Sequence, residues 1–136
     1  MDTSVWSLAL RRRQLGPTHP AVTELADLVR EMRAHLLGAI RQEILSGIRE
    51  ASQFEKLRSR LGAFPDLSVT TADHEKAAEL FNLCRGRGLQ GSNTDFLICA
   101  VAQRLEIPIL TTDGDFELFA QHISIEMHVP RGRANE

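Results

Sequence analysis

Residues 107–116 read IPILTTDGDF, and this stretch is the most informative one for the architecture. Its apolar half, residues 107–112, predicts a short buried strand, and the Asp-Gly-Asp turn behind it predicts a helix over 116–121. Strands that alternate with helices form parallel sheets covered by helices. Because ligands bind beyond the carboxyl ends of the strands in such open sheets, Asp113 lies where chemistry is expected.

The other predicted elements follow from hydrophobic periodicity and from Gly and Pro breakers. Helices are predicted over 21–33, over 71–85 with Thr71 as N-cap, over 93–105, and around two apolar stripes, Ile40, Ile44, Leu45, Ile48 and Phe54, Leu57, Leu61. Shorter apolar runs predict strands at 36–37, 67–69 and 123–127. The core face expected of the helix over 71–85 is Ala77, Leu80, Phe81 and Cys84. The pattern as a whole is that of an α/β protein.

Size and composition favour one domain over residues 1–136. A chain of 136 residues, 43% of them apolar, should bury roughly two thirds of the surface of the unfolded chain, so it needs no metal or disulfide simply to fold. Its formal net charge of −2 is close to balanced. Its two cysteines, Cys84 and Cys99, lie in apolar helical patterns and are predicted to be reduced core residues. We find no run of about 18 apolar residues and no signal-peptide design, so we expect a cytoplasmic protein that has no membrane partner.

Two further acidic residues stand out from their surroundings. Asp95 falls in the first turn of the apolar helix over 93–105, where a solvated surface explains it poorly, and helix capping is its alternative role. Glu43 is flanked by Ile40 and Ile44, and on its own it is typical of a surface glutamate. Neither residue identifies a site when taken alone.

A family resemblance joins these acids. It is carried by four stretches, DTSVW at 2–6, QEILSG at 42–47, GSNTDFLICA at 91–100 and LTTDGDF at 110–116. In order, spacing and neighbouring residues, the sequence resembles the PIN-domain ribonucleases, most closely the VapC-type toxins of toxin–antitoxin pairs. The resemblance implies a PIN-like three-layer α/β fold, with a short central parallel sheet flanked by helices, and a metal-dependent endoribonuclease activity.

The resemblance also implies a catalytic site made of four carboxylates. Asp2 and Asp95 would be the main ligands of Mg²⁺, with Mn²⁺ as the alternative metal, and Asp113 would complete the ligand shell. Glu43 would orient a ligand water or assist its deprotonation. Such oxygen ligands suit a hard, octahedral ion, which activates water for in-line attack on a phosphodiester.

Three residues near the acids have supporting roles by the same resemblance. Ser4 and Thr111 would hold the carboxylates through hydrogen bonds. Asp115 competes with Asp113 as the fourth acid, and its alternative role is an N-cap for the helix that starts at Phe116.

Two groups of arginines are candidates for RNA contact. Arg11, Arg12 and Arg13 follow the first acid, and Arg85 and Arg87 precede Asp95; a solvated surface is the alternative for both groups. The chain has no tyrosine, one tryptophan and six phenylalanines, so base stacking is not expected to dominate recognition.

The resemblance also predicts partners, and the sequence departs from the family pattern at its first strand. A homodimer neutralised by a cognate antitoxin is expected, with Val22, Leu25 and Val29 as candidates for the antitoxin groove and core packing as their alternative. A degenerate PIN domain that only binds RNA or protein is the alternative function.

Only Met1 precedes Asp2, whereas the family's first acid ends a buried strand. We therefore expect the first strand to be truncated or missing and the reading frame to begin upstream.

Overall fold

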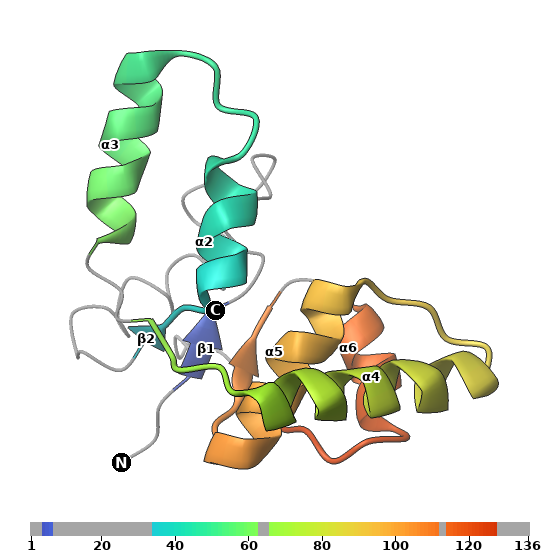
Figure 1. The fold of residues 1–136 in the computed structure, drawn as a ribbon. Coiled ribbons are helices and arrows are strands. Elements are labelled where there is room, and N and C mark those ends of the chain that lie inside the picture. The colour runs from blue at the N-terminus through green and yellow to red at the C-terminus, as the bar shows by residue number, and fades with distance from the viewer. Residues whose placement is uncertain (1–3, 7–33, 63–65, 112–113, 128–136) are drawn as a thin grey trace, which may run out of the picture.

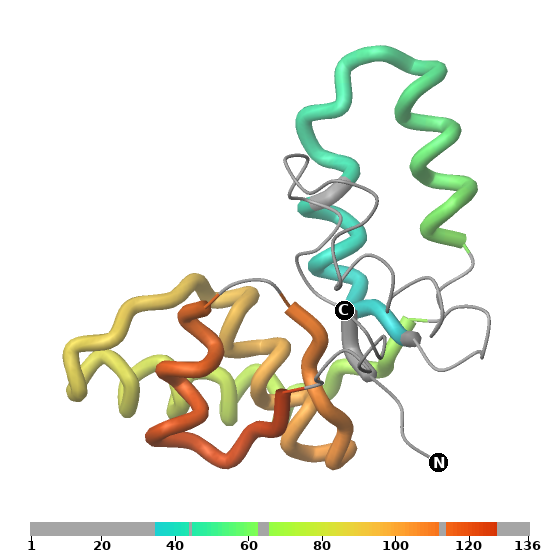
Figure 2. The backbone as a smooth tube through the Cα atoms, turned by 180° about the vertical axis from the view of Figure 1, so that it is seen from behind, coloured from blue at the N-terminus to red at the C-terminus, as the bar shows by residue number. Residues whose placement is uncertain are grey.

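Three short strands form one parallel sheet between two groups of helices (Figure 1). The computed structural model describes residues 4–6, 34–62, 66–111 and 114–127. The elements in chain order are β1 (Ser4–Trp6), β2 (Ala34–His35), α2 (Gly38–Leu45), α3 (Ala51–Leu61), α4 (Thr71–Gly86), α5 (Asn93–Leu105), β3 (Ile109–Leu110) and α6 (Asp115–Ala120). Both views show α2 and α3 on one side of the sheet and α4, α5 and α6 gathered on the other (Figures 1 and 2).

The first strand occupies the centre of the sheet, in the order β2-β1-β3. Val5 is paired in parallel with His35 on one side and with Ile109 on the other. The expectation of a missing strand is therefore wrong. The strand is short and follows Asp2, whereas the family pattern led us to expect that it would precede Asp2.

The predicted outer strands form only single bridges. Leu36 bridges to Asp66 and Ile109 bridges to Met127, both in parallel. The segment 67–69 makes one bond to the residue after β2, and the chain then enters α4 at Thr71. In the segment 123–127, the Ile125 amide bonds back to the Ile123 carbonyl at 3.0 Å, so this part of the segment is a tight turn, and the Ile109 amide donates to the Glu126 carbonyl at 2.8 Å.

The remaining strands are displaced or shortened relative to the prediction. The strand expected at 36–37 lies at Ala34–His35, because the chain turns into α2 after Leu37. The strand expected over 107–112 is reduced to Ile109–Leu110. The Ile107 amide donates to the Ala102 carbonyl of α5 at 3.1 Å and Pro108 has no amide hydrogen, so Ile109 is the first of these residues whose amide is available to the sheet.

Helix α5 is the centre of the core. Its residues from Phe96 to Ala102 are all buried, which explains why it is apolar around its whole circumference. The faces of α4 and α3 pack on the same core, where Leu80, Cys84 and Leu61 are buried. Cys84 and Cys99 are buried and unbridged, as predicted.

Helix boundaries show where capping chemistry acts. Thr70, rather than Thr71, is the N-cap of α4 and forms a reciprocal capping box with Asp73. Asp115 is the first residue of α6, whose N-cap is Gly114, so its predicted role as an N-cap is wrong. The helices around Ile40 and Phe54 are confirmed, although α2 ends at Leu45, before Ile48.

The helix predicted over 21–33, with its Val22, Leu25 and Val29, lies outside the described part of the chain. Within the described residues, we find no helix of the length and apolarity that crossing a membrane requires.

Candidate active site

Two strands of the parallel sheet lead towards described candidate residues. The carboxyl end of β2 leads into α2, which carries Glu43, and the carboxyl end of β3 leads to Thr111. Parallel strands end at the same edge, so these residues follow the strands on the side where α/β proteins bind ligands. Asp2 and Asp113 lie outside the described residues, as do Arg11, Arg12 and Arg13.

Two further helices begin near that edge. The first turns of α5 and α6 lie beside the end of β3 in both views (Figures 1 and 2). The two helices are joined by aromatic contacts: the Phe96 ring centroid is 4.7 Å from that of Phe119, which lies 5.5 Å from Phe116. Asp95 and Asp115 therefore begin neighbouring helices.

The geometry of Asp95 combines a cap with a position at the site edge. The Ser92 amide donates to Asp95 Oδ2 at 3.1 Å, and the Asp95 amide donates to Ser92 Oγ at 3.0 Å. Both predicted roles are thus compatible, because a carboxylate has more acceptor sites than one cap uses. The bonds fix the half-buried Asp95 side chain at the amino end of α5, whose dipole favours negative charge.

The charge of Asp95 also reaches the core thiol one turn further on. Burial raises the pKa of the Cys99 thiol far above its ordinary value, and the negative charge of Asp95 raises it further. Cys99 therefore stays a neutral thiol at physiological pH and is not a nucleophile.

The other described candidates differ in exposure. Glu43 and Thr111 are half-buried, whereas Asp115, Arg85 and Arg87 are exposed. In the described residues we find no group of three or more His, Cys, Asp or Glu side chains that could hold a metal ion. Two of the three predicted ligands fall outside that part of the chain.

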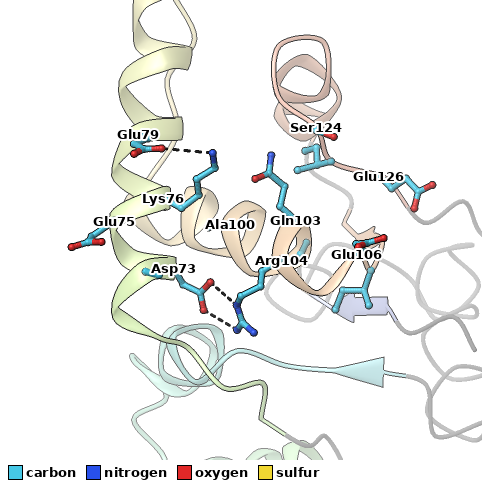
Figure 3. A pocket seen from close by; sticks show the side chains of 14 residues that line it. Asp73, Glu75, Lys76, Glu79, Ala100, Gln103, Arg104, Glu106, Ser124 and Glu126 are labelled. Carbon is cyan, nitrogen blue, oxygen red and sulfur yellow. Dashed lines mark hydrogen bonds and ion pairs between the residues drawn. The ribbon is translucent and has the colours of Figure 1, made fainter.

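One buried acid was not singled out as a site residue. Among the described residues, Asp73 is the charged side chain buried in the core, with 2% of its surface exposed. Its two carboxylate oxygens accept bonds from Arg104 Nε and Nη2, each at 2.8 Å (Figure 3). Arg104 Nη2 also donates to the Ser68 carbonyl at 2.8 Å. The Thr70-x-x-Asp73 capping motif was visible in the sequence, but nothing in the sequence indicated the pairing with Arg104.

The Asp73–Arg104 pair lies in the wall of an open groove of about 950 Å³, at the end of α5 that is remote from Asp95. Figure 3 shows the two side chains directed at each other, with Lys76 and Glu79 forming a second ion pair along α4. The bond from Arg104 lowers the pKa of Asp73, burial opposes this, and the Thr70 amide lowers it further. Asp73 is thus a paired structural charge that ties α4 to α5.

Comparison with known proteins identifies the family. The sequence matches the family model of the PIN domain over residues 1–121. The chain belongs to the PIN-domain family. Its structure also resembles FitAcB from Neisseria gonorrhoeae, with a TM-score of 0.71 and 15% sequence identity, over 94% of this chain and 98% of that chain. The predicted PIN-like fold is therefore confirmed, while no curated protein matches the sequence.

Proposed function

We propose that this PIN domain is a metal-dependent endoribonuclease and the toxin of a toxin–antitoxin pair. PIN domains are generally nucleases. The observation that carries the proposal is the position of Asp95: a half-buried carboxylate, oriented by Ser92, in the first turn of a helix beside the carboxyl end of a parallel strand. The resemblance of the sequence to VapC-type toxins supports the same function.

The donor chemistry of the candidate residues fits Mg²⁺. Asp95 and Glu43 offer carboxylate oxygens, whereas the described cysteines, whose thiolates would select softer metals, are buried and stay protonated. By resemblance, Asp2, Asp95 and Asp113 would hold Mg²⁺ or Mn²⁺. When bound, such an ion lowers the pKa of a water molecule and neutralises charge on the scissile phosphate.

The chain's own residues would supply orientation and binding. The Ser92 amide fixes the Asp95 carboxylate, and Ser4 and Thr111 are proposed to hold the other carboxylates by hydrogen bonds. Glu43 would accept a proton from the attacking water. Arg85 and Arg87 are exposed on the approach to α5, where they would bind the phosphates that flank the cut.

The test is incubation of the purified protein with total RNA, with and without Mg²⁺ and with an excess of chelator. We expect discrete cleavage products only in Mg²⁺, and none from a folded Asp95→Asn variant. Cleavage that persists in chelator would exclude the metal mechanism. Cleavage by the Asp95→Asn variant at the wild-type rate would exclude the site.

One observation favours the alternative of a non-catalytic PIN domain. The capping box explains Asp95 without any chemistry, since an N3 aspartate alone stabilises a helix start. The same experiment separates the two functions. RNA that is bound but remains uncut at every Mg²⁺ and Mn²⁺ concentration would identify a binding module.

The proposed partners follow from the toxin assignment. We expect a homodimer that acts on RNA in the cytoplasm and is neutralised by an antitoxin encoded beside it. An antitoxin arginine directed at the carboxylates would compete with the metal. Light scattering at micromolar concentration tests the dimer, and a monomer there would contradict it.

A further inference from the structure

A small pocket opens beside the first turn of α5. It has a volume of about 220 Å³ and is lined by Phe81, Arg85, Leu89, Gln90, Gly91 and Phe96. These residues come from the end of α4, the connecting loop and the start of α5. The pocket therefore lies between the exposed Arg85 and the candidate active-site residue Asp95.

The walls of the pocket are planar and firmly supported. Phe81 meets Phe96 edge to face, with ring centroids 5.6 Å apart and planes at 73°. Phe96 is fully buried and packs in turn on Phe119, while Phe81 is only partly buried. Arg85 lies over the Phe81 ring, with Cζ 5.9 Å from the centroid. An aromatic surface with a cationic plane above it is thus presented at the pocket.

The absence of a side chain at residue 91 lets the backbone wall of the pocket pack closely on two rings. A Cβ atom at Gly91 would lie 2.8 Å from Phe119 Cζ and 2.9 Å from Phe96 Cε2, closer than carbon atoms can approach. The backbone therefore runs directly against the two rings, which fixes the Gly91 side of the pocket.

We propose that this pocket receives one unstacked base of a single-stranded RNA. Single-stranded RNA is recognised by proteins through bases that stack on aromatic rings or on arginine planes. Arg85 and Phe81 provide both kinds of surface, and the exposed amide of Gln90 provides a donor and an acceptor for the edge of a base. The proposal rests on the proposed function, whose substrate class it specifies.

The position of the pocket defines which nucleotide it reads. Gly91 and Phe96 lie immediately before and after the Ser92–Asp95 capping box. A base held between them keeps its own phosphodiester bond close to the Asp95 carboxylate. The pocket would therefore set a base preference at a nucleotide adjacent to the cut.

Two variants and two matched controls test the pocket. Phe81→Leu removes the aromatic plane and keeps apolar volume; Arg85→Lys keeps the charge and removes the plane at an exposed site, where folding is not at risk. Phe54→Leu and Arg60→Lys, the latter at an exposed position, are the controls, and both lie on α3. The probes are short single-stranded RNAs of adenine, cytosine or uracil, and one RNA that carries a single 2-aminopurine. Binding is measured in chelator, so that no RNA is cut.

We expect Phe81→Leu and Arg85→Lys to weaken RNA binding by about tenfold and to restore the fluorescence of the stacked 2-aminopurine. Both controls should bind as the wild type does. The differences in affinity among the adenine, cytosine and uracil RNAs should become smaller in the two pocket variants and stay unchanged in the controls. Adenosine monophosphate should bind far more weakly than the RNA, and equal affinity would mean that the pocket takes a free nucleotide instead.

The outcomes separate this proposal from the proposed function. Unchanged affinity, fluorescence and base preference in both pocket variants would overturn the pocket, even if the protein cuts RNA. Loss of binding in the pocket variants of a protein that never cuts RNA would support the pocket and contradict the nuclease. A wild-type protein that binds none of the RNAs would overturn the pocket as well.

Discussion

Ser92 and Asp95 bond to each other across the first turn of α5, each side chain accepting from the other's backbone amide at 3.0–3.1 Å. One carboxylate therefore starts the most buried helix of the described chain and lies at the candidate active site. The two roles need different properties of the side chain. The cap needs an acceptor oxygen, whereas a metal site needs the negative charge.

Substitutions at these two positions are expected to separate the roles. Asp95→Asn keeps an acceptor for the Ser92 amide, so the free energy of unfolding should fall by no more than about 1 kcal/mol while RNA cleavage is lost. Ser92→Ala removes a cap bond and keeps the charge, so it should cost about 1 kcal/mol and retain cleavage. Thermal melts and RNA cleavage assays measure both effects. Equal loss of cleavage in the two variants at equal stability would contradict the separation.

Added Mg²⁺ should stabilise the wild-type protein through the carboxylates. At a metal concentration about 100 times the Kd, binding to the folded state alone adds about 2.7 kcal/mol. We expect the melting temperature to rise with Mg²⁺ and to return on chelation, and the rise to be strongly reduced in Asp95→Asn. A shift of the same size in Asp95→Asn would place the ion elsewhere.

The Asp73–Arg104 pair should matter for stability and not for chemistry. Asp73→Ala removes the acceptor of the Thr70 amide in the α4 capping box and the buried partner of Arg104, so we expect a loss of about 2 kcal/mol or more in the free energy of unfolding. The matched control is Glu79→Ala, which breaks the exposed pair with Lys76 at 3.6 Å and should cost less than about 0.5 kcal/mol. Urea denaturation of both variants measures these losses in the free energy of unfolding. Equal losses in the two variants would refute the structural role of Asp73.

The same carboxyl group predicts a dependence of stability on pH. Its pKa is lowered in the folded protein by the bond from Arg104, against an ordinary value of about 3.9 in the unfolded chain. The stabilisation is therefore complete above about pH 4 and is lost as the pH falls through the lowered pKa of the folded state. Between about pH 6 and about pH 2, the free energy of unfolding should fall more steeply with decreasing pH in the wild type than in Asp73→Asn. Parallel curves would be inconsistent with a lowered pKa.

Gly91 should not tolerate a methyl group. In Gly91→Ala the new Cβ would collide with the rings of Phe96 and Phe119, so we expect a loss of about 1–3 kcal/mol. Gly38→Ala is the control: it lies at the first position of α2, where an added Cβ would meet no atom within 4 Å, and it should be neutral or slightly stabilising. Melts of both variants test this, and a neutral Gly91→Ala would mean that the rings move aside without cost.

Hydrophobic periodicity in the sequence was sufficient to predict the described helices of this protein. The stripes of α4 and α5 extend over several turns, and both helices lie within one residue of the predicted ranges. Phe81 was expected in the core but is only partly buried. Periodicity identifies the face of a helix, but it does not show that the neighbouring loop leaves a pocket against that face.

The strands were harder to predict because each is only two or three residues long. An apolar run such as 123–127 carries the same signal whether it forms a ladder or a single bridge, and the backbone bond of Ile125 to Ile123 decides between them. The Asp73–Arg104 pair, between residues far apart in sequence, had no local signal either. Asp95 stood out because an acid in an apolar helix conflicts with its surroundings, but the family resemblance was needed to propose it as a site residue.

The sheet order has a consequence for the timing of folding. The central strand is made first during synthesis, yet Val5 pairs with Ile109, which is made near the end. Such sequence-distant pairing gives a high contact order, which slows folding because a long loop must close before the pairing stabilises it. At a synthesis rate of about 5–20 residues per second, the first strand waits several seconds for such a partner. A nascent chain that stops before β3 has the first strand but cannot complete the sheet.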